Sequence, residues 1–223
     1  MVGRSVVLRV EKSAAEPTDV VLAVDELEVN DDRGQIAVDG LSFEVRAGEI
    51  LGIAGVEGNG QRELVEAVTG LRQPLSGTMR INGEEVTNGS ARDISKRGVA
   101  HIPEDREKHG VIAVYSLAEN SVLNRYHRSP FSFRGILRRD VIDRHAEDVV
   151  EEFDVRTPSI AVTASSLSGG NKQKLIVGRE FSDDIELLIA AQPTRGIDIG
   201  AIEFINRRIL EQRDKGAAVL LVS

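Results

Sequence analysis

An apolar run, a glycine-rich loop and an amphipathic segment follow one another between Glu49 and Val68. The loop reads GVEGNG at residues 55–60, and the next segment, QRELVEAV, carries apolar side chains at helical spacing. Such a strand–loop–helix unit presents backbone N–H groups and a helix N-terminus to an anion. The outline is G-x-x-x-x-G-K-[ST], but Gln61 and Arg62 stand at its last two positions. Alone, the stretch is as compatible with a tight turn as with phosphate binding.

Strand and helix patterns alternate along the rest of the chain, which predicts an α/β core with a parallel sheet and a mainly helical insertion. Residues 21–29 and 36–45 alternate like half-buried strands, and residues 76–86 resemble a hairpin that turns at Asn82-Gly83. DREKHG at 105–110 is expected to be a charged loop. Two helices have predicted apolar faces. Their members are Leu64, Val65, Val68 and Leu71 in the first and Ile142, Ala146, Val149, Val150 and Phe153 in the second.

Composition excludes several kinds of function. The 223 residues carry a net charge of −8, which argues against broad nucleic-acid binding. The absence of cysteine excludes disulfides and thiolate metal sites, and the four scattered histidines have no metal-like spacing, so no metal site is expected. The sequence has no bilayer-spanning apolar run and no signal-peptide pattern, so we expect a soluble intracellular chain.

A second motif, LSGGNK at 167–172, is followed by LLIAAQPTRGID at 187–198. This order after a glycine-rich loop resembles the ATPase domain of ATP-binding cassette (ABC) transporters, over roughly residues 21–223. The resemblance implies the P-loop NTPase fold of ABC ATPases, with an antiparallel β subdomain and a helical subdomain. The sequences GNGQRE, LSGGNKQK and AAQPTRGID further resemble those of the second, C-terminal cassette of tandem ATPase subunits in sugar and nucleoside importers of the ribose type.

That resemblance implies a domain layout. Residues 1–19 are expected to be a linker from a preceding cassette, and residues 20–223 an ABC nucleotide-binding domain with its helical subdomain at about 112–164. A C-terminal part that would hold the switch histidine is expected to be missing.

The resemblance also assigns site residues. The nucleotide loop comprises Gly55, Glu57, Gly58, Asn59, Gly60, Gln61 and Arg62. The signature motif, which serves the partner's nucleotide in trans, comprises Ser168, Gly169, Gly170 and Asn171. Glu104 takes the place of a glutamine that reaches the metal, Gln192 that of the catalytic glutamate, and Asp198 lies at the dimer interface of the family.

Four departures from the family pattern fall on metal-assisted phosphoryl transfer. Gln61 replaces the phosphate-binding lysine and Arg62 the hydroxyl that ligates Mg²⁺. Ala191 replaces the Walker B aspartate, and Gln192 has no basic carboxylate. An aromatic residue to stack on adenine is not evident in VNDDRGQI. We therefore expect ATP as cofactor, weak or absent Mg²⁺ binding at this domain's own site, and a signature that completes the partner's site.

The expected function is ATP-powered uptake of a sugar or nucleoside. The implied partners are another cassette, membrane permease subunits and, indirectly, an extracellular substrate-binding protein, with the domain peripheral at the cytoplasmic face of the membrane. One alternative is a cassette ATPase acting on ribosomes or DNA, which would usually keep both catalytic sites. A GTPase-type switch would need N-K-x-D, whereas residues 171–174 read NKQK.

A basic stretch with interleaved aromatics, RYHRSPFSFRGILRR, runs from Arg125 to Arg139. It is either an ordinary solvated face or, as the family implies for this subdomain, lies near the contact with the permease.

Overall fold

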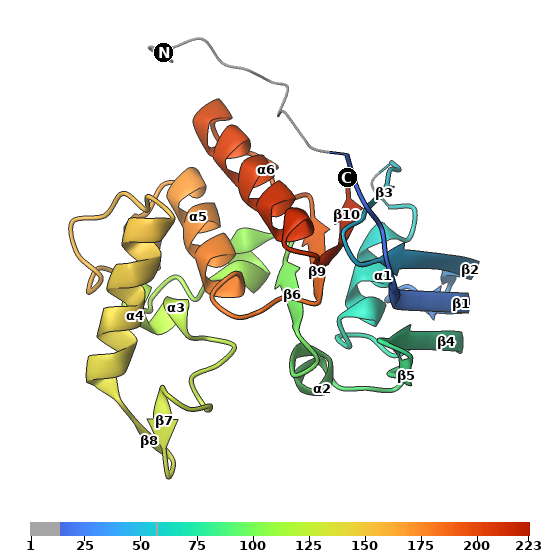
Figure 1. Cartoon of the computed structure of the whole chain (residues 1–223), viewed down its shortest axis with the longest axis horizontal. Helices are drawn as coiled ribbons and strands as arrows, with labels where there is room; N and C mark the ends of the chain where they lie inside the picture. Colours follow the sequence, from blue (N-terminus) through green and yellow to red (C-terminus); the bar gives the residue numbers. More distant parts are fainter. Residues whose placement is uncertain (1–13, 57) are drawn as a thin grey trace. The chain divides into compact units, whose positions relative to one another are not determined.

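The computed structural model describes residues 14–56 and 58–223 (Figure 1). These residues form two compact units. The sheet unit extends to His101 and includes Asp183–Gln192 and Arg207–Ser223. The helical unit comprises Ile102–Ser182 and Pro193–Asn206.

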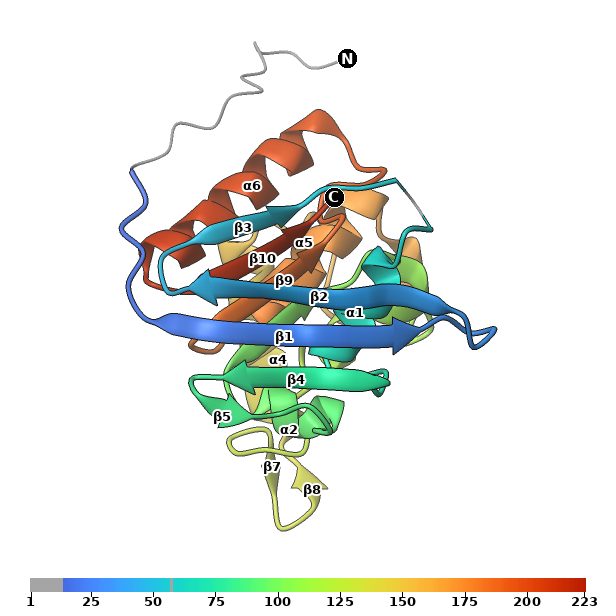
Figure 2. The ribbon, with the colours of Figure 1, turned by 90° about the vertical axis from the view of Figure 1, so that its right-hand side faces the viewer.

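An antiparallel sheet forms one layer of the sheet unit, with strand order β2-β1-β4-β5 (Figure 2). Its strands are β1 (Val20–Asn30), β2 (Ile36–Arg46), β4 (Ser76–Ile81) and β5 (Glu84–Glu85). Asn82 and Gly83 both have positive φ, at 50° and 78°, between β4 and β5. This is the backbone that a two-residue hairpin turn requires, so the predicted Asn-Gly turn is confirmed.

A second sheet has the order β3-β10-β9-β6. It consists of β3 (Ile50–Ile53), β10 (Ala218–Val222), β9 (Leu187–Ala191) and β6 (Val99–Ile102). β10 pairs in parallel with both β3 and β9, and all five residues of β9 are buried. The near-continuous apolar sequences of β9 and β10 suit strands that are covered on both faces. The predicted parallel sheet is therefore confirmed.

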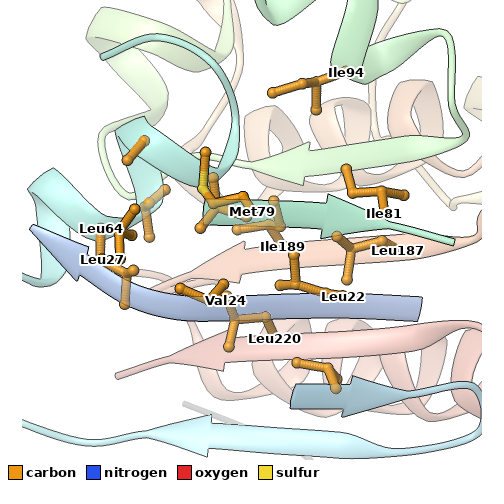
Figure 3. Packing of buried hydrophobic residues seen from close by; sticks show 14 of the residues in the cluster. Leu22, Val24, Leu27, Leu64, Met79, Ile81, Ile94, Leu187, Ile189 and Leu220 are labelled. Atoms are coloured by element: carbon orange, nitrogen blue, oxygen red, sulfur yellow. The ribbon is translucent and has the colours of Figure 1, made fainter. Parts of the chain in front are cut away.

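The core of the sheet unit draws side chains from both sheets and from α1 (Gln61–Val68) (Figure 3). Leu64 of α1 lies in the same cluster as Leu27 of β1, Met79 of β4 and Ile189 of β9. A shorter helix, α2 (Ala91–Ser95), contributes Ile94 to it. The core thus fixes α1 through its apolar face.

The structure contradicts one member of the first apolar face. Leu64, Val65 and Val68 are buried, but Leu71 is 61% exposed. α1 ends at Val68, and Gly70 follows with φ 72°. A left-handed glycine at this position terminates the helix, so helical spacing no longer applies at Leu71.

The helical unit contains α3 (Leu117–Ser121), α4 (Arg139–Glu152), the 3-10 turn η2 (Ala164–Ser166) and α5 (Gly169–Glu180). α6 (Ile199–Asp214) has residues in both units. The predicted face of the second helix is confirmed at Ile142, Ala146, Val149 and Phe153, which are all buried. Val150 is only half-buried.

Two further expectations need correction. The charged segment DREKHG is a π-helical turn, η1 (Arg106–Gly110), because the Asp105 carboxylate accepts hydrogen bonds from the N–H groups of Glu107 and Lys108, each at 3.0 Å. The insertion also contains a β-hairpin of β7 (Ser132–Phe133) and β8 (Ile136–Leu137), which helical periodicity did not predict. Within the described residues, no helix is both long and apolar enough to cross a membrane.

Candidate functional site

The glycine-rich loop connects β3 to α1 in the sheet unit, and Gly60 is its most constrained residue. Gly60 caps α1 with a left-handed backbone, φ 83°. A Cβ atom at this position would lie 2.1 Å from the backbone carbonyl oxygen of Ala37 in β2. Glycine is therefore required here by the packing of the unit itself, whatever ligand the loop binds.

Gln61, the first residue of α1, contacts Gly55 and Ser223. Its amide nitrogen donates a hydrogen bond to the carbonyl oxygen of Ser223 at 3.4 Å. The same nitrogen lies 2.8 Å from the place that a Cβ on Gly55 would take. The neutral side chain thus lies beside Gly55, at the position where the family pattern has a lysine, and it can offer a phosphate only uncharged donors.

Arg62 takes part in an ion-pair network on the exposed side of α1. Its Nε lies 2.7 Å from Glu66 Oε1, and its guanidinium is 3.7 Å from Asp32. Arg72 contacts both acids, with Nη2 at 2.6 Å from Asp32 Oδ1 and 2.7 Å from Glu66 Oε2. The network ties the start of α1 to the turn between β1 and β2.

These contacts change the ionisation of the network. Partial burial opposes charge on Glu66, but hydrogen bonds from Arg62 and Arg72 outweigh it and lower the pKa of this carboxyl. The hydrogen bond to Glu66 in turn raises the pKa of Arg62. Arg62 is therefore a guanidinium held by carboxylates, which cannot ligate a cation.

Ala191 and Gln192 follow at the end of β9. Ala191 is 4% exposed and presents a methyl group. Gln192 has a left-handed backbone, φ 46°, and its N–H donates to the carbonyl oxygen of Val222 at 2.8 Å. Neither side chain has a carboxylate for a metal ion or for a water molecule.

The donor set can be compared with what ATP and Mg²⁺ need. The backbone of Gly58 and Gly60 and the N-terminus of α1 fit an anion such as a phosphate. Mg²⁺ prefers carboxylate and hydroxyl oxygens, which Arg62 and Ala191 do not supply. In the described part of the chain, no group of three or more His, Cys, Asp or Glu residues has the arrangement of a metal site. The residues fit the nucleotide phosphates and do not fit the cation.

The signature motif lies at the start of α5 in the helical unit. Ser168 caps this helix, and its Oγ accepts hydrogen bonds from the backbone N–H of Asn171 at 3.4 Å and from its Nδ2 at 3.1 Å. Asn171 Oδ1 accepts from the Arg156 N–H at 3.0 Å. Because Ser168 acts as an acceptor, its own hydroxyl proton can still be donated. Asn171 thus holds the serine in place.

The two signature glycines leave room for groups of the same unit. A Cβ on Gly170 would lie 2.8 Å from Asp198 Oδ2, and one on Gly169 would lie 3.1 Å from Arg106 Nη2. Asp198 also caps α6, since its Oδ1 accepts from the N–H of Ala201 at 3.0 Å. Asp198 therefore has a structural role inside the unit, and its predicted place at a dimer interface stays a prediction.

Glu104 pairs with Arg195, a residue in the turn after β9. The same turn is held by Arg106, whose Nη1 donates to the Arg195 carbonyl oxygen at 2.6 Å and whose Nη2 donates to that of Gly196 at 3.1 Å. Glu104 thus has an ion-pair partner in its own unit, and its predicted role toward a nucleotide remains untested.

The structure brings the predicted residues together in two groups. Gly55, Gly58, Asn59, Gly60, Gln61, Arg62 and Gln192 lie in the sheet unit, and Glu104, Ser168, Gly169, Gly170, Asn171 and Asp198 lie in the helical unit. Glu57 lies outside the described residues. Sequence reasoning missed Arg106 and Arg195, and also the network partners of Arg62. Only the i,i+4 spacing of Arg62 and Glu66 could have indicated one of these pairs.

Several import ATP-binding proteins align with the whole chain. The guanosine import ATP-binding protein NupO of Bacillus subtilis is 51% identical over 223 residues, which are 100% of this chain and 44% of that protein. The glucose import ATP-binding protein TsgD13 of Haloferax volcanii is 43% identical over 225 residues, 100% of this chain and 41% of that protein. The chain therefore spans less than half the length of either relative.

A solved structure confirms the expected fold. A nucleotide-free ATP-binding cassette from an ABC transporter superposes with a TM-score of 0.75 at 19% identity, covering 92% of this chain and 81% of that one. The family model described as "ABC transporter" matches residues 38–195, which include both the glycine-rich loop and the signature. From this match and the two relatives, the chain belongs to the ABC transporter ATPase family.

Proposed function

We propose that this chain is the nucleotide-binding domain of an importer that uses ATP to take up a nucleoside or a simple sugar. The support is similarity along the full chain to two import ATP-binding proteins. The guanosine importer's subunit is the more similar of the two, at 51% against 43% identity, which favours a nucleoside. The solute itself is selected by the permease and the binding protein, which are the implied partners along with the cytoplasmic face of the membrane.

The chain is further proposed to be the second cassette of a tandem subunit. Residues 1–19 would be the linker from the first cassette, and residues 20–223 the cassette, with its helical subdomain at about 112–164. The chain covers 44% and 41% of the two relatives. A single cassette would cover about this share of a subunit that contains two. The partner cassette then supplies the other half of each nucleotide site.

The contrast between two motifs carries the proposal about mechanism. Relative to the family pattern, Gln61 and Arg62 replace the phosphate-binding lysine and the metal-ligating hydroxyl after the loop, and Ala191 replaces the aspartate at the end of β9, whereas the signature keeps its serine and both glycines. Ser168 caps α5 and accepts two hydrogen bonds from Asn171, with its own hydroxyl proton available for donation. This domain would therefore retain its own loop as a scaffold or weak nucleotide site, and would donate the signature hydrogen bonds to the γ-phosphate held by its partner.

A steady-state ATPase assay tests the impaired site. The purified chain, supplied with ATP and Mg²⁺, should turn over far below about 1 s⁻¹, the low end of ordinary enzymes. Gln192→Glu should not restore activity, because Arg62 and Ala191 still provide no metal ligand. Turnover near that rate in the purified chain would show that other groups have replaced the missing ones.

The import proposal has a separate test. The tandem subunit, reconstituted with its permease and binding protein in vesicles, should accumulate a radiolabelled nucleoside only when ATP is present. Uptake of labelled glucose in place of nucleoside would show that the importer carries a sugar. Uptake of both solutes without ATP would show that the cassette does not power transport.

A further inference from the structure

The β7–β8 hairpin extends from the helical unit beyond α3 and α4 (Figure 1). Phe133 and Ile136 are directly opposite each other across its strands, and Arg134 and Gly135 form the two-residue turn with φ 51° and 82°. Phe131, at the base, is buried in a cluster with Ile142 and Ala146. The hairpin is thus anchored at its base by the core of the unit.

The end of the hairpin carries apolar side chains that this core does not use. Phe133 is 64% exposed and Ile136 is 73% exposed. As a directly opposed pair, they lie on the same face of the hairpin. Together with Arg138, they line one surface hollow of about 350 Å³. Exposed apolar side chains that lie together on a surface indicate a site that binds a membrane, a protein or a ligand.

Two arginines border this apolar pair. Residues 125–139 include five arginines and no acidic residue, in a chain whose net charge is −8. Arg125 is buried, and its guanidinium donates to the carbonyl oxygen of Arg179, so the solvated-face interpretation fails at that residue. Arg134 and Arg138 are exposed, and the Arg134 guanidinium lies 5.3 Å from the centre of the Phe133 ring. Arg139 pairs with Glu119 at 3.6 Å, so Arg134 and Arg138 are the exposed arginines that lie near the apolar pair in the sequence.

We propose that the β7–β8 hairpin binds the surface of an anionic lipid membrane. Phe133 and Ile136 enter the boundary between headgroups and acyl chains, and Arg134 and Arg138 contact lipid phosphates. Apolar side chains bordered by basic ones are the combination that binds this interface. The inference concerns a surface other than the nucleotide site and holds whether or not this cassette hydrolyses ATP.

A lipid surface fits the hairpin better than an acidic protein segment does. Stable protein interfaces bury roughly 800 Å² on each partner, with matched shapes. The end of the hairpin is narrow and offers two apolar side chains, which is too little surface for such an interface. A bilayer needs no matched shape, because its lipids rearrange around an inserted side chain. Because the whole chain is acidic, general attraction to anionic vesicles is also unfavourable, so binding must be local.

Tryptophan fluorescence provides a direct test, because the chain contains no tryptophan. Phe133→Trp places a single indole on the hairpin, where it replaces an exposed side chain. Its emission should shift to the blue when vesicles of phosphatidylcholine and phosphatidylglycerol are added, and brominated acyl chains should quench it. Val114→Trp is the matched control, since Val114 is 77% exposed in the same unit, and the residues on either side of it are hydrogen-bonded to η2. Its emission should not change.

Vesicle co-sedimentation then measures affinity. Arg134→Asn should weaken binding to the mixed vesicles about fivefold, the effect of one basic residue near an anionic surface. Asparagine adopts positive φ readily, so the turn is kept. Ile136→Ser should weaken binding about tenfold through lost apolar insertion. Arg92→Asn, a change at an exposed arginine of α2, should leave affinity unchanged.

Three results would overturn the proposal. One is equal binding to pure phosphatidylcholine and to the mixed vesicles, and another is the same blue shift at position 114. The third is association that requires the permease in the vesicles, which would assign the hairpin to a protein partner. None of these results bears on ATP turnover, so failure here leaves the proposed function standing.

Discussion

The glycine-rich loop and the signature are both glycine-containing helix starts, yet they hold their polar side chains in different ways. At the loop, Gln61 lies beside Gly55 and donates to the Ser223 carbonyl oxygen, and Arg62 pairs with carboxylates on the flank of α1. At the signature, Ser168 remains at the helix start, braced by Asn171. Arg62 is thus paired within the fold, whereas Ser168 is a helix cap whose hydroxyl proton can still be donated. Which groups a helix start presents therefore depends on the side chains beside its glycines and not on the glycines alone.

Gly60→Ala should give the largest effect, on stability. The new Cβ would meet the Ala37 carbonyl oxygen at 2.1 Å, in a backbone with φ 83°. Left-handed strain and overpacking together should cost about 2–5 kcal/mol in the free energy of unfolding, measured by urea titration. Gly58→Ala, at φ 93° with no atom within 4 Å of the new Cβ, should cost about 1–2 kcal/mol. Equal losses would mean that packing against β2 is not what retains Gly60.

Gly169→Asp should have the next largest effect, on catalysis. In the tandem subunit reconstituted with its permease, it should lower the ATPase rate by about 10²–10³-fold, as the loss of a transition-state donor does. The new carboxylate would oppose phosphate oxygens and would also attract Arg106, 3.1 Å from the new Cβ, away from the carbonyl groups that it binds. Gly169→Ala adds a side chain without a charge, so it should lower the ATPase rate less than Gly169→Asp does.

Gln61→Ala, measured in the same reconstituted subunit, tests the glycine-rich loop in place of the signature. It should leave the rate within about twofold, because a neutral amide contributes no charge-assisted hydrogen bond. If Gln61→Ala abolished activity while Gly169→Asp had no effect, the roles of the two motifs would be reversed.

Glu66→Gln should destabilise the sheet unit at neutral pH by about 1–2 kcal/mol, because two guanidinium groups lose their shared carboxylate. The pKa of Glu66 is lowered in the fold, so this stabilisation is present above the unfolded value of about 4.3 and is lost as the pH falls through the folded pKa. The difference in unfolding free energy between the two proteins, measured by urea titration, should shrink as the pH is lowered below about 4.3.

The matched pair near the signature is Asp154 and Lys174. The hydrogen bond from Lys174 lowers the pKa of Asp154, but the Asp154 side chain is 63% exposed. Asp154→Asn should therefore cost less than about 1 kcal/mol, with the same direction of pH dependence. A larger loss here than at Glu66 would place the stronger ion pairing at the signature helix.

The smallest expected effect concerns Mg²⁺. Calorimetric titration of the chain with ATP should give dissociation constants that differ by no more than about twofold with and without Mg²⁺, or ~0.4 kcal/mol. Backbone N–H groups bind the phosphates in both cases, and neither Arg62 nor Ala191 ligates the ion. A strong requirement for Mg²⁺ would mean that Glu104 leaves Arg195 to coordinate it.

The sequence by itself determined the alternation of strands and helices, the turn at Asn82-Gly83 and both motifs, because these depend on local periodicity and on backbone preferences of single residues. It also predicted which chemical groups are missing, since Gln61, Arg62 and Ala191 can be read directly from the chain.

Only the tertiary structure decided how the remaining groups are used. Asp32 and Arg72 are 40 residues apart and meet at 2.6 Å, and Arg106 reaches carbonyl oxygens 89 and 90 residues away. No local pattern encodes such pairs, because they depend on how strands and turns come together in space. Leu71 and the β7–β8 hairpin escaped prediction for a different reason, since a helix end and a two-residue turn each override the apolar period around them.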